Sequence, residues 1–189
     1  PLNSVRETLL VQATDVQRSE GRELACGRTR RSCEVKAYLL AAGYATRLYP
    51  LTKDRPKPLL EVGGRPLLAH IVDRVAELDG LREIVVVGNH RFAEPLAAFC
   101  ATTPCPVPLR FLDDGSTCED DKLGATGDLA FALRESPPAP DEDFVVVAGD
   151  NWIGFDLRAA QREFEAQGRR ALLLLREHAT VPSGPSPYN

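Results

Sequence analysis

The stretch Lys36–Leu60 reads KAYLLAAGYATRLYPLTKDRPKPLL, and its sequence of residue types constrains what the neighbouring chain can form. It begins with a short apolar run that is long enough for a buried strand and too short for a helix. Gly43 and the two alanines before it are small enough to let a ligand approach the backbone closely. Cationic and hydroxyl-bearing residues follow, among prolines that exclude a regular helix. We therefore expect a buried strand that leads into a stiff, cationic loop suited to an anionic group.

Two widespread phosphate-binding loops do not fit this stretch. The ATPase-type loop needs a second glycine followed by Lys and Ser or Thr, and the dinucleotide-binding loop needs three glycines, whereas only Gly43 is present. The stretch instead resembles the signature of sugar-1-phosphate nucleotidyltransferases, the family of glucose-1-phosphate thymidylyltransferases and mannose-1-phosphate guanylyltransferases. The parts of this signature occur in order at Leu40–Gly43, Thr46–Leu48, Pro50–Thr52 and Pro56–Leu59.

The resemblance implies a reaction and the residues that serve it. Members of this family transfer a nucleoside monophosphate from an NTP to a sugar 1-phosphate, with Mg²⁺ as cofactor, and release pyrophosphate. By resemblance, Arg47 and Lys57 are the catalytic residues, which bind the triphosphate and stabilise developing charge as a guanidinium fork and a rigidly held ammonium can. The nucleotide-binding residues that we expect are Leu40, Ala41, Ala42, Gly43, Thr46, Gly124 and Gly127.

The expected metal ligand lies further along the chain. Asp150 directly follows Gly149 and the apolar run Phe144–Ala148, and in the family a Gly-Asp pair at this strand end holds the metal. A carboxylate at such a place suits Mg²⁺, which prefers a few carboxylate oxygens together with phosphate and water. The acidic run before Gly124 is expected to be a solvated loop rather than a second metal site; its members are Asp113, Asp114, Glu119, Asp120 and Asp121.

The run Gly124–Asp128, GATGD, resembles the family's glycine-bearing loop that approaches the nucleotide base. It departs from the thymidylyltransferase pattern and is more similar to that of the mannose-1-phosphate guanylyltransferases. The nucleotide base and the sugar therefore stay open.

The apolar patterning along the chain predicts an α/β protein. Strands are expected at Ala37–Leu40, Ile84–Val87, Val107–Leu112, Phe144–Ala148 and Ala171–Leu175. Helices are expected over Pro66–Leu78 and Phe92–Cys100, over Gly124–Arg134 as a loop that leads into a helix, and from Asp156 to Gln167. This alternation indicates a Rossmann-like three-layer α/β/α fold with a mostly parallel sheet, as in nucleotide-diphospho-sugar transferases. Ligands bind beyond the carboxyl ends of such strands, where Asp150 and the cationic loop can meet.

The composition excludes several kinds of partner. At 189 residues the chain suits one domain, and its formal charge of −4 argues against nucleic acid or an anionic membrane as the main partner. The longest apolar runs are shorter than the ~18 residues that a membrane span requires. The five cysteines show no metal-site spacing, so we interpret them as free thiols of a cytoplasmic protein.

The two ends of the chain differ from its middle. Residues 1–34 are expected to be a poorly ordered N-terminal extension, and residues 35–189 a nucleotidyltransferase domain that is incomplete at its C-terminal, sugar-binding side. A chain that stopped there would leave a sheet edge open and favour a homo-oligomer. Two alternatives therefore stay open beside the sugar-phosphate enzyme. One is a catalytically inactive nucleotide-binding or regulatory homologue or fragment, and the other is a cytidylyltransferase that acts on an alcohol phosphate such as phosphocholine.

Overall fold

The computed structural model describes residues 34–168 and residue 172. Residues 1–33 of the expected N-terminal extension and all but one residue of the expected strand over 171–175 lie outside this part of the chain. The chain divides into two units, of which one is Cys26–Gln161 and the other joins Pro1–Ala25 with Arg162–Asn189. The first unit holds the sheet described next.

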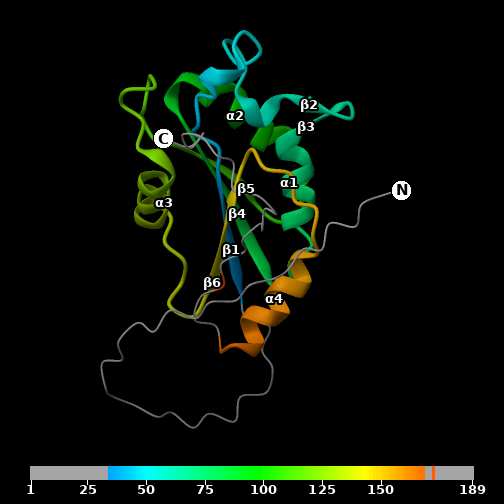
Figure 1. Cartoon of the computed structure of the whole chain (residues 1–189). Helices are drawn as coiled ribbons and strands as arrows, with labels where there is room; N and C mark the ends of the chain where they lie inside the picture. Colours follow the sequence, from blue (N-terminus) through cyan, green and yellow to red (C-terminus); the bar gives the residue numbers. More distant parts are fainter. Residues whose placement is uncertain (1–33, 169–171, 173–189) are drawn as a thin grey trace, which may run out of the picture. The chain divides into compact units, whose positions relative to one another are not determined.

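Four strands form one parallel sheet (Figure 1). They are β1 (Val35–Leu40), β4 (Leu81–Gly88), β5 (Leu109–Asp113) and β6 (Asp143–Ala148). The spatial order is β5-β4-β1-β6, and every neighbouring pair runs parallel. The central strand β1 is almost wholly buried, as expected for an apolar run with neighbours on both sides. A separate antiparallel pair joins β2 (Glu61–Val62) to β3 (Arg65–Pro66).

Helices cover both faces of the sheet, which confirms the three-layer α/β/α fold (Figure 1). They are α1 (Leu67–Val75), α2 (Ala93–Thr102), α3 (Gly124–Glu135) and α4 (Leu157–Ala166). On one face, side chains of α1, α2 and the first turn of α4 pack on the strands; they include Leu68, Ile71, Leu96 and Leu157 over Leu39 and Val86. On the other face, Ala132 of α3 packs against Tyr38, Val85 and Val87.

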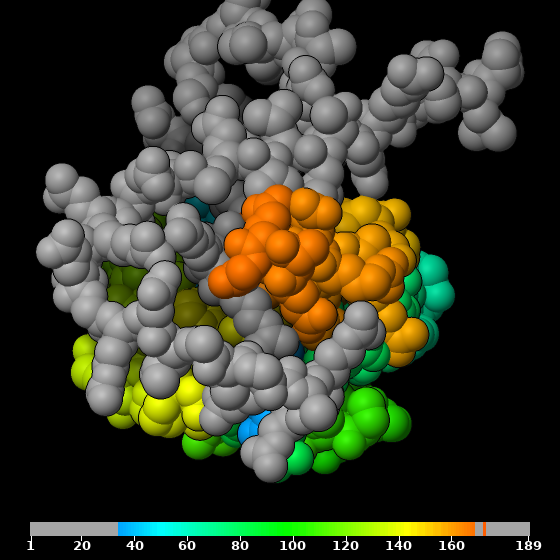
Figure 2. Space-filling view, turned by 90° about the horizontal axis from the view of Figure 1, so that it is seen from below, coloured from blue at the N-terminus to red at the C-terminus, as the bar shows by residue number. Residues whose placement is uncertain are grey.

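The strand order reverses beside β1. The chain passes from β1 to β4 and β5 on one side, and then returns to place β6 on the other side of β1. Ligands of open parallel sheets bind at such a switch point, outside the carboxyl ends of the strands. Figure 2 shows the opposite end, where the beginning of β1 (blue) lies near the segment that leads into β6 (yellow), in keeping with the pairing of Val35 with Asp143.

The GATGD run differs from the sequence prediction. The run GATGD is not a loop, because α3 begins at Gly124, whose φ of 72° lets the chain turn directly into the helix. The prolines do exclude an α-helix from the cationic stretch, which contains only the 3₁₀ turns η1 (Thr46–Leu48) and η2 (Lys57–Leu59). None of the helices within residues 34–168 combines the length and apolar content that crossing a membrane requires.

Candidate active site

Backbone hydrogen bonds join the carboxyl end of β1 to those of its two neighbours, β6 and β4. The Gly149 N–H donates to the Leu40 carbonyl at 2.7 Å, and the Ala41 N–H donates to the Val87 carbonyl at the same distance. Gly149 permits this approach, since a Cβ atom there would lie 3.0 Å from both the Leu40 carbonyl oxygen and the Ala41 Cβ. Asp150 is therefore held next to the loop that follows β1.

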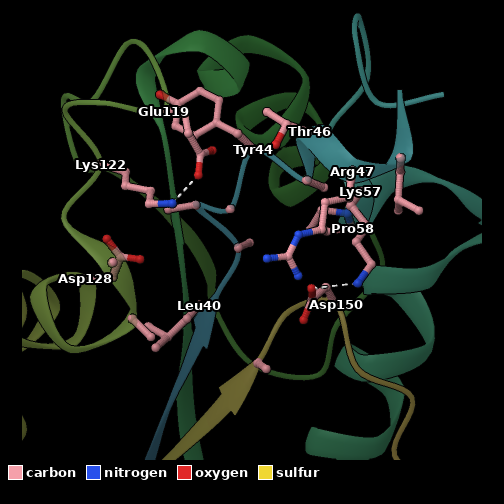
Figure 3. Close-up of a pocket in the computed structure, with 18 residues that line it drawn as sticks. Leu40, Tyr44, Thr46, Arg47, Lys57, Pro58, Glu119, Lys122, Asp128 and Asp150 are labelled. Atoms are coloured by element: carbon pink, nitrogen blue, oxygen red, sulfur yellow. Dashed lines mark hydrogen bonds and ion pairs between the residues drawn. The ribbon is translucent and has the colours of Figure 1, made fainter. Parts of the chain in front are cut away.

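A cavity of about 620 Å³ opens at this end of the sheet (Figure 3). Its walls come from the loop after β1, from η2, from the segment before α3 with the first turns of that helix, and from the end of β6. Nine of the ten expected site residues line it: Leu40, Ala41, Ala42, Gly43, Thr46, Arg47, Lys57, Gly124 and Asp150. The tenth, Gly127, lies on α3 away from the lining, where a Cβ atom would come within 2.8 Å of the Leu123 Cβ.

The cationic residues and the expected metal ligand gather at one end of the cavity. The Lys57 Nζ atom lies 2.8 Å from Asp150 Oδ2, and Arg47 extends toward the same place (Figure 3). The side chains of Lys57 and Asp150 retain 31% and 41% of their exposure, so both are accessible to a ligand in the cavity. This end can accept an anionic group, and its carboxylate can accept a cation.

Buried polar side chains hold the loop after β1 in shape. Asn89, which is fully buried, donates from Nδ2 to the Ala42 carbonyl at 2.8 Å and accepts from the Phe92 N–H through Oδ1 at 3.0 Å. Thr52, also fully buried, donates from Oγ1 to the Ala45 carbonyl at 2.8 Å. Ala45 has a left-handed φ of 49°, a conformation that is rare for alanine. A loop fixed in this way presents its backbone to a phosphate with little reorganisation.

The opposite end of the cavity is acidic. Asp128, on α3, lines the wall and is only 5% exposed, and the ion pair of Lys122 with Glu119 lies nearby (Figure 3). Burial raises the pKa of Asp128 to about 6, and the neighbouring charge of Asp114 and a hydrogen bond to it contribute to the rise. Asp114 is itself partly buried. Its Oδ1 accepts hydrogen bonds from both the N–H and the Oγ of Ser116 at 2.7 Å. The expectation of a solvated acidic loop is therefore wrong for Asp114.

The sequence prediction missed the side chains at this end of the cavity. Asp128 is the last residue of the GATGD run and lies four positions after Gly124, so a helical reading would place both on one face. The prediction treated that run as a loop and so drew no such conclusion. The exposed Lys122 and Glu119 and the buried Tyr44 also line the cavity, and no pattern in the sequence marks them as site residues.

The residues around Asp150 fit a metal that takes most of its ligands from elsewhere. No group of three or more His, Cys, Asp or Glu side chains suited to a metal occurs among residues 34–168. Asp150 is the carboxylate at the cationic end of the cavity. Mg²⁺ is commonly held by one or two carboxylates, with water and phosphate oxygens completing its shell, so one carboxylate beside a phosphate site suits it.

Comparisons with known proteins identify the family of this chain. The sequence model of the nucleotidyl transferase family matches residues 36–182. The chain is 33% identical over 141 residues to the UTP–glucose-1-phosphate uridylyltransferase AglF of Haloferax volcanii. The matched stretch covers 74% of this chain and 54% of that protein. It is 31% identical over 145 residues to the human mannose-1-phosphate guanylyltransferase regulatory subunit alpha, with 75% of this chain and 33% of that protein covered.

The fold also has counterparts among solved structures. A UDP-glucose pyrophosphorylase from Acinetobacter baumannii superposes with a TM-score of 0.55 at 19% identity, over 70% of this chain and 53% of that one. This likeness is one of fold. The chain spans about half the length of AglF, the relative to which it is 33% identical. Because the family model covers most of its residues, the chain belongs to the nucleotidyl transferase family.

Proposed function

We propose that the protein transfers a nucleoside monophosphate from an NTP to a sugar 1-phosphate, giving an NDP-sugar and pyrophosphate. The observation that carries this proposal is the convergence of Arg47, Lys57 and Asp150 on one cavity at the switch point of the sheet. Two cationic side chains beside one carboxylate suit a triphosphate with its bound cation.

In the proposed reaction an oxygen of the sugar phosphate attacks the α-phosphorus of the NTP. A new P–O bond forms, the bond between the α-phosphorus and its bridging oxygen breaks, and pyrophosphate leaves with the electron pair. Arg47 and Lys57 stabilise the negative charge that builds up on the phosphate oxygens. The rigid loop over 41–45 orients the nucleotide, so most of the catalysis is positioning and electrostatics.

Members of this family generally use a divalent metal, and Asp150 is the residue that would hold Mg²⁺ here. Mg²⁺ would add charge stabilisation at the phosphates when bound. Lys57 then has two roles: it neutralises Asp150 while the site holds no nucleotide, and it contacts a phosphate when the nucleotide is bound.

The names of the relatives support a sugar 1-phosphate as the acceptor over an alcohol phosphate such as phosphocholine. AglF is named as a uridylyltransferase acting on glucose 1-phosphate, whereas the human relative is named as a regulatory subunit. The chain spans about half of AglF. The acceptor is therefore proposed from the names of the relatives, and no residue of the cavity is assigned to it.

The proposal is tested by two measurements on the whole chain. Calorimetry with ATP, GTP, CTP, UTP and dTTP in Mg²⁺ measures nucleotide binding, and pyrophosphate release with each NTP and several hexose 1-phosphates measures turnover. We expect binding that Arg47→Ala weakens at least tenfold and turnover that Arg47→Ala abolishes. Arg55→Ala is the matched control, because Arg55 lies in the same loop but pairs with Glu61 outside the cavity at 3.7 Å.

The same measurements separate the alternatives. Nucleotide binding without turnover would indicate a regulatory or inactive homologue, or a fragment of an active enzyme. Turnover with CTP and phosphocholine alone would identify a cytidylyltransferase of alcohol phosphates. Binding that is equally strong in Arg47→Ala and the unchanged protein would refute the assigned site.

A further inference from the structure

Asp128 lines the cavity at the end away from Lys57 and Asp150 (Figure 3), and behind this wall its carboxyl group lies against that of Asp114. Asp128 Oδ1 and Asp114 Oδ2 are both buried, and neither has a hydrogen-bond donor among the described residues. Two ionised carboxylates cannot donate to each other. The pair is therefore satisfied only when one carboxyl carries a proton and donates it to the other.

The proton belongs to Asp128. Asp114 already acts as an acceptor, since its Oδ1 binds the N–H and the hydroxyl of Ser116 at 2.7 Å. The pKa of Asp128 rises, through burial first and Asp114 second. Below a pH of about 6 Asp128 thus donates through one oxygen to Asp114, and its other oxygen is an acceptor in both protonation states.

Asp128 lies where we expect the base of a bound nucleotide. A nucleotide whose phosphates lie at Arg47 and Lys57 extends across the carboxyl end of β1, because that is the direction in which the cavity runs toward α3 (Figure 3). Gly124 and Ala125, in the first turn of α3, line the same cavity, and a Cβ atom at Gly124 would meet no other atom within 4 Å, so this wall is open.

We propose that Asp128, oriented by Asp114, reads the nucleotide base and selects bases that carry an exocyclic amino group (guanine, adenine and cytosine) over uracil and thymine. This inference rests on the proposed function, because it requires that the cavity hold a nucleotide. An amino group presents an N–H donor to the available carboxyl oxygen. The only N–H on the pairing edge of uracil and thymine lies between two carbonyl oxygens, whose lone pairs face the carboxyl group unfavourably.

The experiment measures the affinity of the whole chain for ATP, GTP, CTP, UTP and dTTP by calorimetry in Mg²⁺. We expect the tightest of the three amino-bearing nucleotides to bind at least tenfold more tightly than UTP or dTTP. In Asp128→Ala that nucleotide should lose about tenfold, the value of one hydrogen bond, while UTP and dTTP change less than twofold. Asp128→Asn, which keeps a donor for Asp114 and an acceptor for the base, should retain the preference.

Asp120→Ala is the matched control, since Asp120 is an exposed acid of the same segment outside the cavity. Tightest binding of UTP or dTTP by the unchanged protein would overturn the inference without any variant. An unaltered ratio among the nucleotides in folded Asp128→Ala would also overturn it, even if Arg47→Ala weakens all five equally and the proposed function stands. Failure of all five nucleotides to bind would refute the proposed function together with the inference.

Discussion

Lys57 Nζ lies 2.8 Å from Asp150 Oδ2, although 93 positions separate the two residues in the sequence. Both side chains are partly exposed, so the pair adds little to the stability of the fold. The ion pair matters for binding, because Lys57, which is expected to contact phosphate, neutralises Asp150, which is expected to hold the metal. A triphosphate that takes Lys57 also releases the Asp150 carboxylate for a cation, so the two ligands should bind cooperatively.

Asp150→Asn should separate the affinity for the triphosphate from its dependence on Mg²⁺. Without the carboxylate, Lys57 is free and a negative charge is removed from the site. Binding of metal-free NTP should therefore tighten by roughly threefold to tenfold. Addition of Mg²⁺ should no longer increase the affinity. Calorimetry with and without EDTA measures both effects.

The matched control for this variant is Asp73→Asn. Asp73 forms an ion pair with Arg65 at the same distance of 2.8 Å, also partly exposed, but outside the cavity. Its loss should leave NTP affinity and the effect of Mg²⁺ unchanged. An Asp150→Asn protein that still responds fully to Mg²⁺ would show that the metal is held elsewhere.

Gly149→Ala should disturb the site by pushing apart the ends of β1 and β6. The added Cβ would lie 3.0 Å from the Leu40 carbonyl oxygen and from the Ala41 Cβ, closer than real Cβ contacts normally are. Overpacking of this kind costs roughly 1–3 kcal/mol, and here it also displaces Asp150. We expect a lower melting temperature together with weaker Mg²⁺-dependent NTP binding.

Gly154→Ala tests whether any extra methyl group near Asp150 has this effect. A Cβ at Gly154 would meet Trp152 at 3.9 Å, an ordinary contact, and the backbone there does not have a positive φ. Its melting temperature and NTP affinity should stay close to those of the unchanged protein. Equal losses in the two variants would contradict the role assigned to the approach of the strands at Gly149.

Asp128→Asn should stabilise the protein at neutral and alkaline pH. The pKa of Asp128 is about 6 in the folded protein, above its ordinary value of 3.8, because burial and Asp114 disfavour the ionised form. A raised pKa in the folded state gives stability that is fully present below pH 3.8 and is lost as the pH rises through about 6. The variant has no such loss, so its advantage should approach about 3 kcal/mol above pH 7 and vanish near pH 4.

Urea unfolding at several pH values between 4 and 8 measures this difference. The exposed Asp120 supplies the control, since Asp120→Asn should not give a stability difference that grows with pH in the same range. An Asp128→Asn protein whose stability follows that of the unchanged protein at every pH would show that Asp128 does not carry the buried proton.

The sequence predicted that two strand ends would be neighbours. One leads into the loop with Arg47 and Lys57, and the other carries Asp150. In a parallel sheet all carboxyl ends lie on one edge, so a short apolar run followed by a polar motif is enough to place each of them. The contact of Asp128 with Asp114 was not predictable in this way. It depends on the rotation of α3 and on the course of the segment over 114–123, neither of which follows from hydrophobic periodicity.

Glycine was also misleading in the GATGD run. Two glycines within four residues are typical of a loop, because glycine is unfavourable inside helices. Here Gly124 supplies a positive φ at the point where the loop ends, and Gly127 avoids a clash with Leu123 in the first turn of α3. Both glycines therefore serve the beginning of a helix, and this became clear only from the backbone geometry.

Asn89→Ala should weaken nucleotide binding without removing any residue that lines the cavity. The side chain is fully buried and connects the Ala42 carbonyl to the Phe92 N–H. Its loss leaves the buried Ala42 carbonyl without this donor, whereas the Phe92 N–H keeps its bond to the Asn89 carbonyl at 3.3 Å. We expect a loss of roughly 2–3 kcal/mol in the free energy of unfolding and at least a threefold loss in NTP affinity.

Tyr38→Phe is the control, because the Tyr38 hydroxyl donates a buried hydrogen bond of 2.6 Å to the Ser136 carbonyl, and neither residue lines the cavity. That variant should lose stability and keep its NTP affinity. If both variants lose affinity in proportion to stability, the Asn89 bridge acts on the fold in general rather than on the shape of the loop after β1.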